Sequence, residues 1–267
     1  MDLIESKSKD KHYLTKSDLY SKGKMNYESA KKMSDDKVLG LLETMPNTKG
    51  TSMYLRLMNY LIVALIDPTA DFNTKIYKIW YCVFICRFWK HWIKENSQYS
   101  LKDNFLTLNT YTCIELNGHM LIKLITIFRS NKDLTSDMFC PWVFNSQQCE
   151  SLFRAARSMT STFSTVINFS IKDFLNRIDR ISFINYVVND LKDSYVFPRE
   201  NKRNISTNFY KLTEEELEKV NIKETVNRAL DNAFQEIKEL GIVVDIGVGS
   251  GLDIKFTTDS ICEEETE

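Results

Sequence analysis

The residues of this sequence best suited to chemistry stand at the start of one short helix. Asn145 and Gln148 have the types and spacing of a helix N-cap and its third helical position. Glu150 then falls in the first turn, where the aligned amide dipoles keep a carboxylate ionised. Carboxylate oxygens are preferred ligands of Mg²⁺ and Mn²⁺, so Glu150 is a candidate metal ligand. The alternative is an ordinary helix ion pair with Arg154 and Arg157.

Four arginines in the same region have the chemistry of phosphate contact. They are Arg154, Arg157, Arg177 and Arg180. Guanidinium groups bind phosphate oxygens, so these side chains are candidate contacts to a DNA backbone. Exposed, solvated charge is the alternative. The whole chain has 35 Lys and Arg against 36 Asp and Glu, which is far from the strong basic stripe of a dedicated DNA binder.

Two pairs of side chains have the spacing of half a metal site. Glu115 and His119 lie four residues apart on one predicted helix face, as do Cys82 and Cys86. Since neither pair has a second half, we favour a satisfied polar contact for the first and core packing for the second. The 6 cysteines form no CxxC pair, and they predict reduced thiols of a nuclear or cytoplasmic protein.

The composition predicts a mainly α protein with a sizeable core, because 43% of the residues are apolar while glycine (8) and proline (4) are scarce. Apolar spacing and stop signals predict helices over 27–43, 51–66, 72–94, 109–128, 146–158, 170–189 and 213–240. The apolar face of 72–94 is too wide for a surface helix, so its aromatic residues indicate a bundle core rather than stacking faces for bases.

Three other features complete the expected organisation. The apolar runs 53–66 and 76–92 are interrupted by charge and too short to cross a membrane, so we expect no membrane span. A short strand is possible at 242–246. The glycine run 247–251 follows it, but no helix comes next, so a nucleotide-binding role for this run is disfavoured.

The segment 145–180 resembles the C-terminal part of P-element-like transposases. In that family an N-x-Q-x-x-E-x-x-F-like motif carries the last acidic residue of a DDE site, and Asn145, Gln147, Glu150 and Phe153 match it here. The likeness covers about residues 20–190 by pattern. Upstream segments that resemble the family's helical insertion domain and the approach to it are 24–30, 79–84, 104–107 and 113–117.

The resemblance implies a helical bundle that corresponds to the insertion domain, followed by the final helices of an incomplete RNase H-like domain. The expected segments are a loosely ordered N-terminus (1–24), the insertion-like domain (25–140), the Glu-bearing helices (141–195), and a long helix with an acidic tail (196–267). It also implies GTP as a possible ligand near 50–140, although no phosphate-binding glycine loop occurs there.

The family chemistry gives Glu150 a catalytic and metal-binding role. Such sites use two Mg²⁺ or Mn²⁺ ions to clamp the attacking and leaving oxygens during DNA cleavage and strand transfer. The family's two upstream Asp ligands and its zinc-coordinating DNA-binding domain have no counterpart in this sequence. Because one carboxylate cannot hold two metal ions, we expect this chain to be inactive alone.

Besides a guanine-nucleotide-binding insertion domain, which the resemblance alone implies, two functions follow from the sequence. The first is a truncated or domesticated transposase-derived protein, nuclear or cytoplasmic, that contacts DNA through its arginines. The second is a helical protein-interaction module without chemistry, whose partner binds the helix over 213–240 and the acidic tail. Residues 201–267 carry 8 basic and 15 acidic side chains, which suits a solvated tail.

Overall fold

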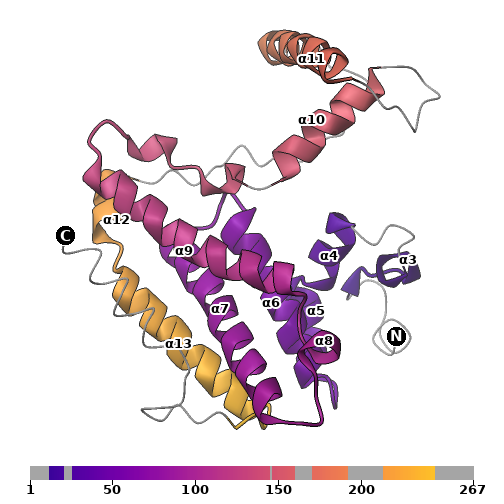
Figure 1. Cartoon of the computed structure of the whole chain (residues 1–267), viewed down its shortest axis with the longest axis vertical. Coiled ribbons are helices and arrows are strands. Elements are labelled where there is room, and N and C mark those ends of the chain that lie inside the picture. The colour runs from indigo at the N-terminus through magenta and orange to yellow at the C-terminus, as the bar shows by residue number, and fades with distance from the viewer. Residues whose placement is uncertain (1–11, 21–25, 145, 160–169, 192–212, 244–267) are drawn as a thin grey trace. The chain divides into compact units, whose positions relative to one another are not determined.

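The computed structural model describes residues 12–20, 26–144, 146–159, 170–191 and 213–243 (Figure 1). These residues are mainly helical and include no strand, so the mainly α expectation is confirmed. The helices are α3 (Lys16–Leu19), α4 (Tyr27–Met33), α5 (Asp36–Glu43), α6 (Lys49–Leu65), α7 (Phe72–Glu95), α8 (Leu101–Asn104), α9 (Leu108–Ser130), α10 (Gln147–Ser158), α11 (Ile171–Leu191), α12 (Glu214–Lys219) and α13 (Ile222–Glu239), with 3₁₀ turns η1 (Ser136–Met138) and η2 (Pro141–Val143).

Several of the features expected from the sequence fall partly or wholly outside the described residues. The possible strand fails at Ile242 and Val243, which are not in a strand, and residues 244–246 lie outside the described residues. The glycine run 247–251 and the acidic tail also lie outside them. The expected loose N-terminus falls partly on undescribed positions, while the described residues 12–20 include the short helix α3.

The chain forms two compact units. Unit 1 comprises residues 1–142 and 210–267, and unit 2 comprises residues 143–209. The described helices of unit 2 are α10 and α11, and all the other α-helices belong to unit 1. The C-terminal helices α12 and α13 therefore belong to the same body as the N-terminal helices, with unit 2 inserted between them in sequence.

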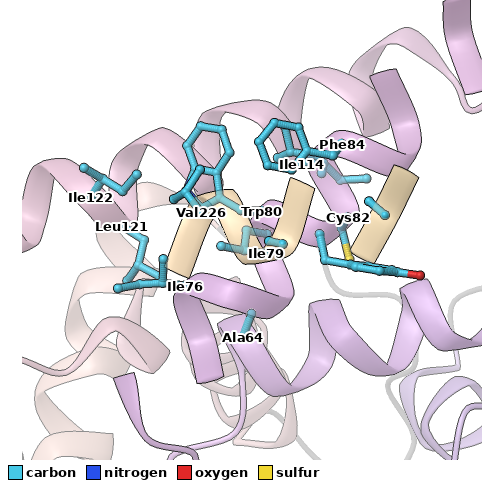
Figure 2. Packing of buried hydrophobic residues seen from close by; sticks show 14 of the residues in the cluster. Ala64, Ile76, Ile79, Trp80, Cys82, Phe84, Ile114, Leu121, Ile122 and Val226 are labelled. Carbon is cyan, nitrogen blue, oxygen red and sulfur yellow. The ribbon is translucent and has the colours of Figure 1, made fainter. Parts of the chain in front are cut away.

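Helix α7 is the centre of unit 1. Thirteen of its 24 residues are buried, and they face several directions around the helix axis, as the wide apolar face over 72–94 predicted. Helices α6, α9 and α13 all pack against it. Figure 2 shows part of this core, with labelled residues from α6 (Ala64), α7 (Ile76, Ile79, Trp80, Cys82, Phe84), α9 (Ile114, Leu121, Ile122) and α13 (Val226).

Side-chain caps set the helix starts, and two of them divide helices that we expected to be continuous. Asp71 Oδ1 accepts from Thr74 N (2.9 Å) and begins α7 at Phe72, the residue predicted. Asp35 caps α5, so the helix expected over 27–43 is two helices, α4 and α5. Asn221 Oδ1 accepts from Glu224 N (3.0 Å), so the helix expected over 213–240 is also two, α12 and α13.

Helix α13 buries one whole face against α7. Its buried side chains recur three or four residues apart, as expected for one stripe of an amphipathic helix. They are Ile222, Thr225, Val226, Ala229, Ala233 and Ile237. The small alanines allow a close approach of the two helices. The apolar face of the segment proposed for a protein partner therefore forms part of the protein's own core.

A buried lysine and a half-buried arginine hold helix ends in unit 1. The Lys75 side chain is fully buried and donates to the carbonyl oxygens of Val63 (3.0 Å) and Asp67, at the end of α6. Arg129 of α9 donates to the carbonyl oxygens of Leu217 (2.8 Å) and Val220 (2.5 Å), where α12 ends. These bonds satisfy helix C-terminal carbonyls that the helices themselves leave without partners.

A smaller apolar cluster joins the N-terminal segment to α5. It contains Leu14, Val38 and Leu42, with Met33 and Leu41 packed beside them. None of the helices within the described residues is long and apolar enough to cross a membrane.

Candidate functional site

The Glu150 carboxylate lies on the exposed surface of α10, in the first turns of that helix. Ser146 occupies the N-cap position, and its hydroxyl donates to Glu150 Oε1 at 3.0 Å. The predicted cap residue Asn145 lies outside the described residues. Among the described residues, Glu150 has Ser146 as its hydrogen-bond partner and forms no ion pair with Arg154. Such an ion pair was the alternative to a metal-binding role for Glu150. The carboxylate is thus open to solvent and presented on a helix.

Arg154 and Arg157 share the exposed face of α10 with Glu150, because the three residues are spaced four and three apart. Both arginine side chains are exposed. The opposite face carries the apolar residues, with Ala156 fully buried and Leu152 half-buried. This helix therefore has one charged face that is accessible to a ligand and one apolar face used for packing.

Helix α11 packs against that apolar face and fixes α10 within unit 2. The rings of Phe153 and Phe174 stack with centroids 4.8 Å apart and planes 12° apart. Arg177 Nη1 donates to the carbonyl oxygen of Ala156 at 3.0 Å. Ile181 is the buried apolar residue that α11 contributes.

The four candidate arginines therefore have different surroundings. Arg177 is half-buried and holds the α10 backbone, so its observed contact is structural. Arg154, Arg157 and Arg180 are exposed. Arg180 lines a shallow hollow with Met159 at the end of α10. Three of the four side chains are thus exposed to solvent.

The possible metal half-sites are occupied by ordinary contacts. Arg87 donates to both oxygens of Glu115, and the Tyr111 hydroxyl donates to Glu115 Oε1 at 2.7 Å. Cys82 and Cys86 are fully buried in the main core. Burial raises the pKa of the Cys86 thiol to about 12 and that of Cys82 well above its ordinary value. In the described part of the chain, no three His, Cys, Asp or Glu side chains come together as metal ligands.

Residues 50–140, where the family resemblance implied GTP, form α6 to α9 and most of the main core. The aromatic residues of α7 lie in or beside the core, as the wide apolar face of this helix predicted. Trp80, Phe84 and Phe88 are fully buried, while Trp89 and Trp92 are half-buried. The first three have no face left for a base to stack on.

Sequence reasoning missed an exposed apolar surface on α11. The sequence predicted a helix over 170–189 from its apolar spacing but gave no sign that Ile171 would be 80% exposed and Phe183 68% exposed. Leu175, Ile184 and Tyr186 are exposed as well. The length of α11 could have indicated this exposed surface. A 21-residue helix with apolar residues around most of its circumference cannot be covered by a 12-residue partner.

Sequence reasoning also missed a groove in unit 1. The turn 46–50 was interpreted only as a helix stop, yet it forms one wall of a groove of about 1050 Å³. The end of α13 forms the other wall, and two tryptophans of α7 also line the groove. These segments are far apart in sequence, so no local pattern predicts the groove.

Comparison of the chain with models of protein families, with curated proteins and with solved structures finds no match.

Proposed function

We propose that this chain is a transposase-derived helical protein that binds DNA weakly and does not cut it alone. The observation that carries the proposal is the exposed charged face of α10, where Glu150, Arg154 and Arg157 stand together while the other face packs on α11. Glu150, the acidic residue of the segment that resembles the transposase motif, thus lies on an exposed surface.

The expected binding mode is contact with the phosphate backbone. Arginine side chains on a helix surface neutralise phosphates and release counterions, so affinity falls as salt rises. Arg154, Arg157 and Arg180 supply such contacts, whereas the acidic Glu150 beside them limits their strength. The chain's net charge of −1 also argues for weak, salt-sensitive binding. Nothing in this mode selects a base sequence.

The test is fluorescence anisotropy with a labelled duplex, comparing the wild type with the double variant Arg154→Glu, Arg157→Glu. We expect the charge reversal to weaken binding by about tenfold or more and to reduce the slope of log affinity against log salt by about 2. The matched control, Lys102→Glu with Lys223→Glu, reverses two exposed charges in unit 1. Equal losses in both double variants, or no binding to DNA at low salt, would overturn the proposal.

The absence of cleavage is tested separately. A supercoiled plasmid incubated with the chain and Mg²⁺ or Mn²⁺ should stay intact. Nicking that disappears in Glu150→Gln would show that the carboxylate is catalytic in this chain. The proposed inactivity would then be wrong, whereas the proposed DNA binding would be unaffected.

A second candidate is a protein-interaction module, and the exposed apolar residues of α11 favour it. Large apolar side chains gathered on one exposed helix commonly mark a docking surface. Because the apolar face of α13 packs on α7, deletion of 213–240 would disrupt the core rather than test a partner. Partner binding that survives reversal of Arg154 and Arg157 but is lost in Leu175→Lys, Phe183→Lys would favour this second function.

A further inference from the structure

A small cleft lies beside the short helix α8, which follows α7 and precedes α9 (Figure 1). Lys90 of α7, Tyr111 of α9 and residues 101–102 and 105–108 line it. Its volume, about 410 Å³, lies in the range typical of small-molecule sites. The lining surface is almost wholly apolar, so the cleft suits an apolar group better than a sugar or a nucleotide, whose many polar groups need partners.

Leucine side chains of this cleft remain open to water. Leu108 is 73% exposed and Leu101 is 37% exposed, and Leu106, which also lines the cleft, is half-buried. A single exposed leucine is ordinary on a protein surface, but these side chains line one common cleft. An apolar chain that covered them would remove their surface from water, which is favourable.

Aromatic contacts hold the side chains around the cleft in place. The Phe105 ring contacts the rings of Trp89 (5.1 Å between centroids) and Tyr111 (5.5 Å). The Tyr111 hydroxyl in turn donates to Glu115 Oε1 at 2.7 Å, and Glu115 is paired with Arg87. The cleft is therefore formed without a ligand, and this lowers the entropic cost of ordering side chains when a ligand binds.

The charged side chains that line the cleft are both lysines, Lys90 and Lys102. The Lys90 ammonium group lies 4.1 Å from the centroid of the Tyr111 ring, and this contact holds it at the cleft. Within the described residues, neither lysine forms an ion pair. Asp103 follows Lys102 in sequence, but it accepts from the Ser100 hydroxyl (2.7 Å) and does not line the cleft. The charge of the cleft therefore favours an anion.

We propose that this cleft binds a single-chain anionic amphiphile, namely a free long-chain carboxylate. The alkyl chain lies against Leu101, Leu106 and Leu108, and the carboxylate faces Lys90 and Lys102. An acidic peptide would match the charge, but its backbone polar groups would find few partners on an almost wholly apolar lining. The cleft belongs to unit 1, so this binding is independent of DNA binding by unit 2.

Isothermal titration calorimetry on the full chain tests the ligand chemistry with four probes, each kept below its micelle concentration. They are dodecanoate, octanoate, dodecyltrimethylammonium and a pentapeptide of alternating leucine and glutamate. We expect dodecanoate to bind tighter than the cationic amphiphile and the peptide by about tenfold or more. Octanoate should also bind about tenfold or more weakly than dodecanoate, because its shorter chain buries less apolar surface.

Three outcomes of this titration overturn the proposal. They are equal affinity for the two long-chain probes of opposite charge, tighter binding of the peptide than of dodecanoate, and no heat with dodecanoate up to about 1 mM.

Charge-removing variants test the location. The double variant Lys90→Gln, Lys102→Gln should weaken dodecanoate binding by about tenfold. The matched control, Lys94→Gln with Lys223→Gln, removes two exposed charges outside the cleft and should bind dodecanoate as the wild type does. Thermal unfolding verifies that the variants are folded. Because Lys90 contacts the Tyr111 ring, Lys102→Gln alone, at an exposed position, gives a second test with a loss of about threefold. Equal losses in the two double variants overturn the proposed location.

Variants of the exposed leucines test the apolar wall separately. Leu101→Ser with Leu108→Ser should weaken binding of dodecanoate and of dodecyltrimethylammonium alike, by about fivefold or more, because both chains lose the same apolar surface. The matched control is Leu116→Ser with Ile127→Ser, since these α9 side chains are 62% and 40% exposed and lie outside the cleft. Undiminished dodecanoate binding by the folded Leu101→Ser, Leu108→Ser variant overturns the proposed location.

Discussion

Arg87 of α7 and Glu115 of α9 form a two-point ion pair, with Nε 2.8 Å from Oε1 and Nη2 2.6 Å from Oε2. Both side chains are largely buried, at 14% and 16% exposure. A pair of this kind fixes the register of the two helices, because neither partner can move by a turn without leaving a buried charge. It therefore gives Glu115 a structural contact, whereas its spacing from His119 in the sequence had also allowed a metal-binding role.

The first prediction concerns this ion pair. Glu115→Ala should lower the free energy of unfolding by roughly 2 to 4 kcal/mol, since it removes the carboxylate that pairs with the largely buried Arg87 guanidinium. Urea unfolding followed by circular dichroism measures the change. Glu115→Gln keeps the shape and part of the hydrogen bonding, so its loss should be smaller. An unchanged midpoint in Glu115→Ala would show that the pair contributes nothing to stability.

The same pair should make stability depend on acid. Burial alone would raise the pKa of Glu115, but the Arg87 hydrogen bonds and charge lower it below the ordinary 4.5. A carboxylate with a lowered pKa stabilises the fold above its ordinary pKa, and this stability is lost as pH falls through the lowered value. Unfolding curves below pH 4.5 should therefore show a steeper loss for the wild type than for Glu115→Gln. Parallel losses would contradict this assignment.

The second prediction concerns the buried ammonium group of Lys75. Burial lowers its pKa from 10.5 to about 8, while Asp67 and Asp71 act in the opposite direction. The unfolded chain then holds a proton that the folded chain releases, so stability from this group rises as pH increases from about 8 to 10.5. Lys75→Met should be less stable at neutral pH by about 1 to 3 kcal/mol, because carbonyl groups at the end of α6 lose their donor. The difference between wild type and variant should grow with pH over this interval.

The third prediction compares two helical glycines. A Cβ atom at Gly118 would lie 3.1 Å from Val83 Cγ2, whereas one at Gly40 would meet no atom within 4 Å. Gly40→Ala should stabilise the protein by up to about 1 kcal/mol through helix propensity. Gly118→Ala should lose most of that gain or destabilise the protein, because α7 and α9 approach each other there. Chemical denaturation measures the stability of both variants. Equal stabilisation would show that α7 and α9 can move apart at Gly118 without cost.

The fourth prediction concerns thiol reactivity. Cys113 and Cys149 are exposed, whereas Cys82 and Cys86 are fully buried with raised pKa values. A water-soluble disulfide reagent should therefore modify the exposed pair in the native protein and reach the buried pair only on unfolding. Replacing Cys113 and Cys149 by serine should remove two rapidly reacting thiols. Rapid native reaction at Cys82 would contradict the packing of α7.

The sequence predicted the helices whose ends carry strong local signals. Asp71 begins α7, and Asp67 with Pro68 follows the end of α6, so both boundaries were expected within a few residues. The internal breaks before α5 and α13 were missed because continuous apolar spacing hid the capping residues Asp35 and Asn221. An Asx residue with a polar side chain acceptor can end one helix and start another without proline or glycine.

The surroundings of the candidate site depended on tertiary structure and could not be predicted in the same way. Arg177 had the same standing in the sequence as Arg154, yet its contact with the Ala156 carbonyl separates the two. The opposite walls of the groove likewise come from α6 and α13, whose facing residues are brought together by α7. No spacing rule contains that information.

The packing of α13 on α7 also governs how this protein can be made. Helix α13, the last one that the structure describes in unit 1, is synthesised after unit 2, although it covers a face of a helix that begins at residue 72. While the ribosome is still adding residues 143–209, that face of α7 has no cover. The nascent chain must therefore be kept from aggregating until α13 emerges, and a chain truncated before α13 would have a permanently uncovered core.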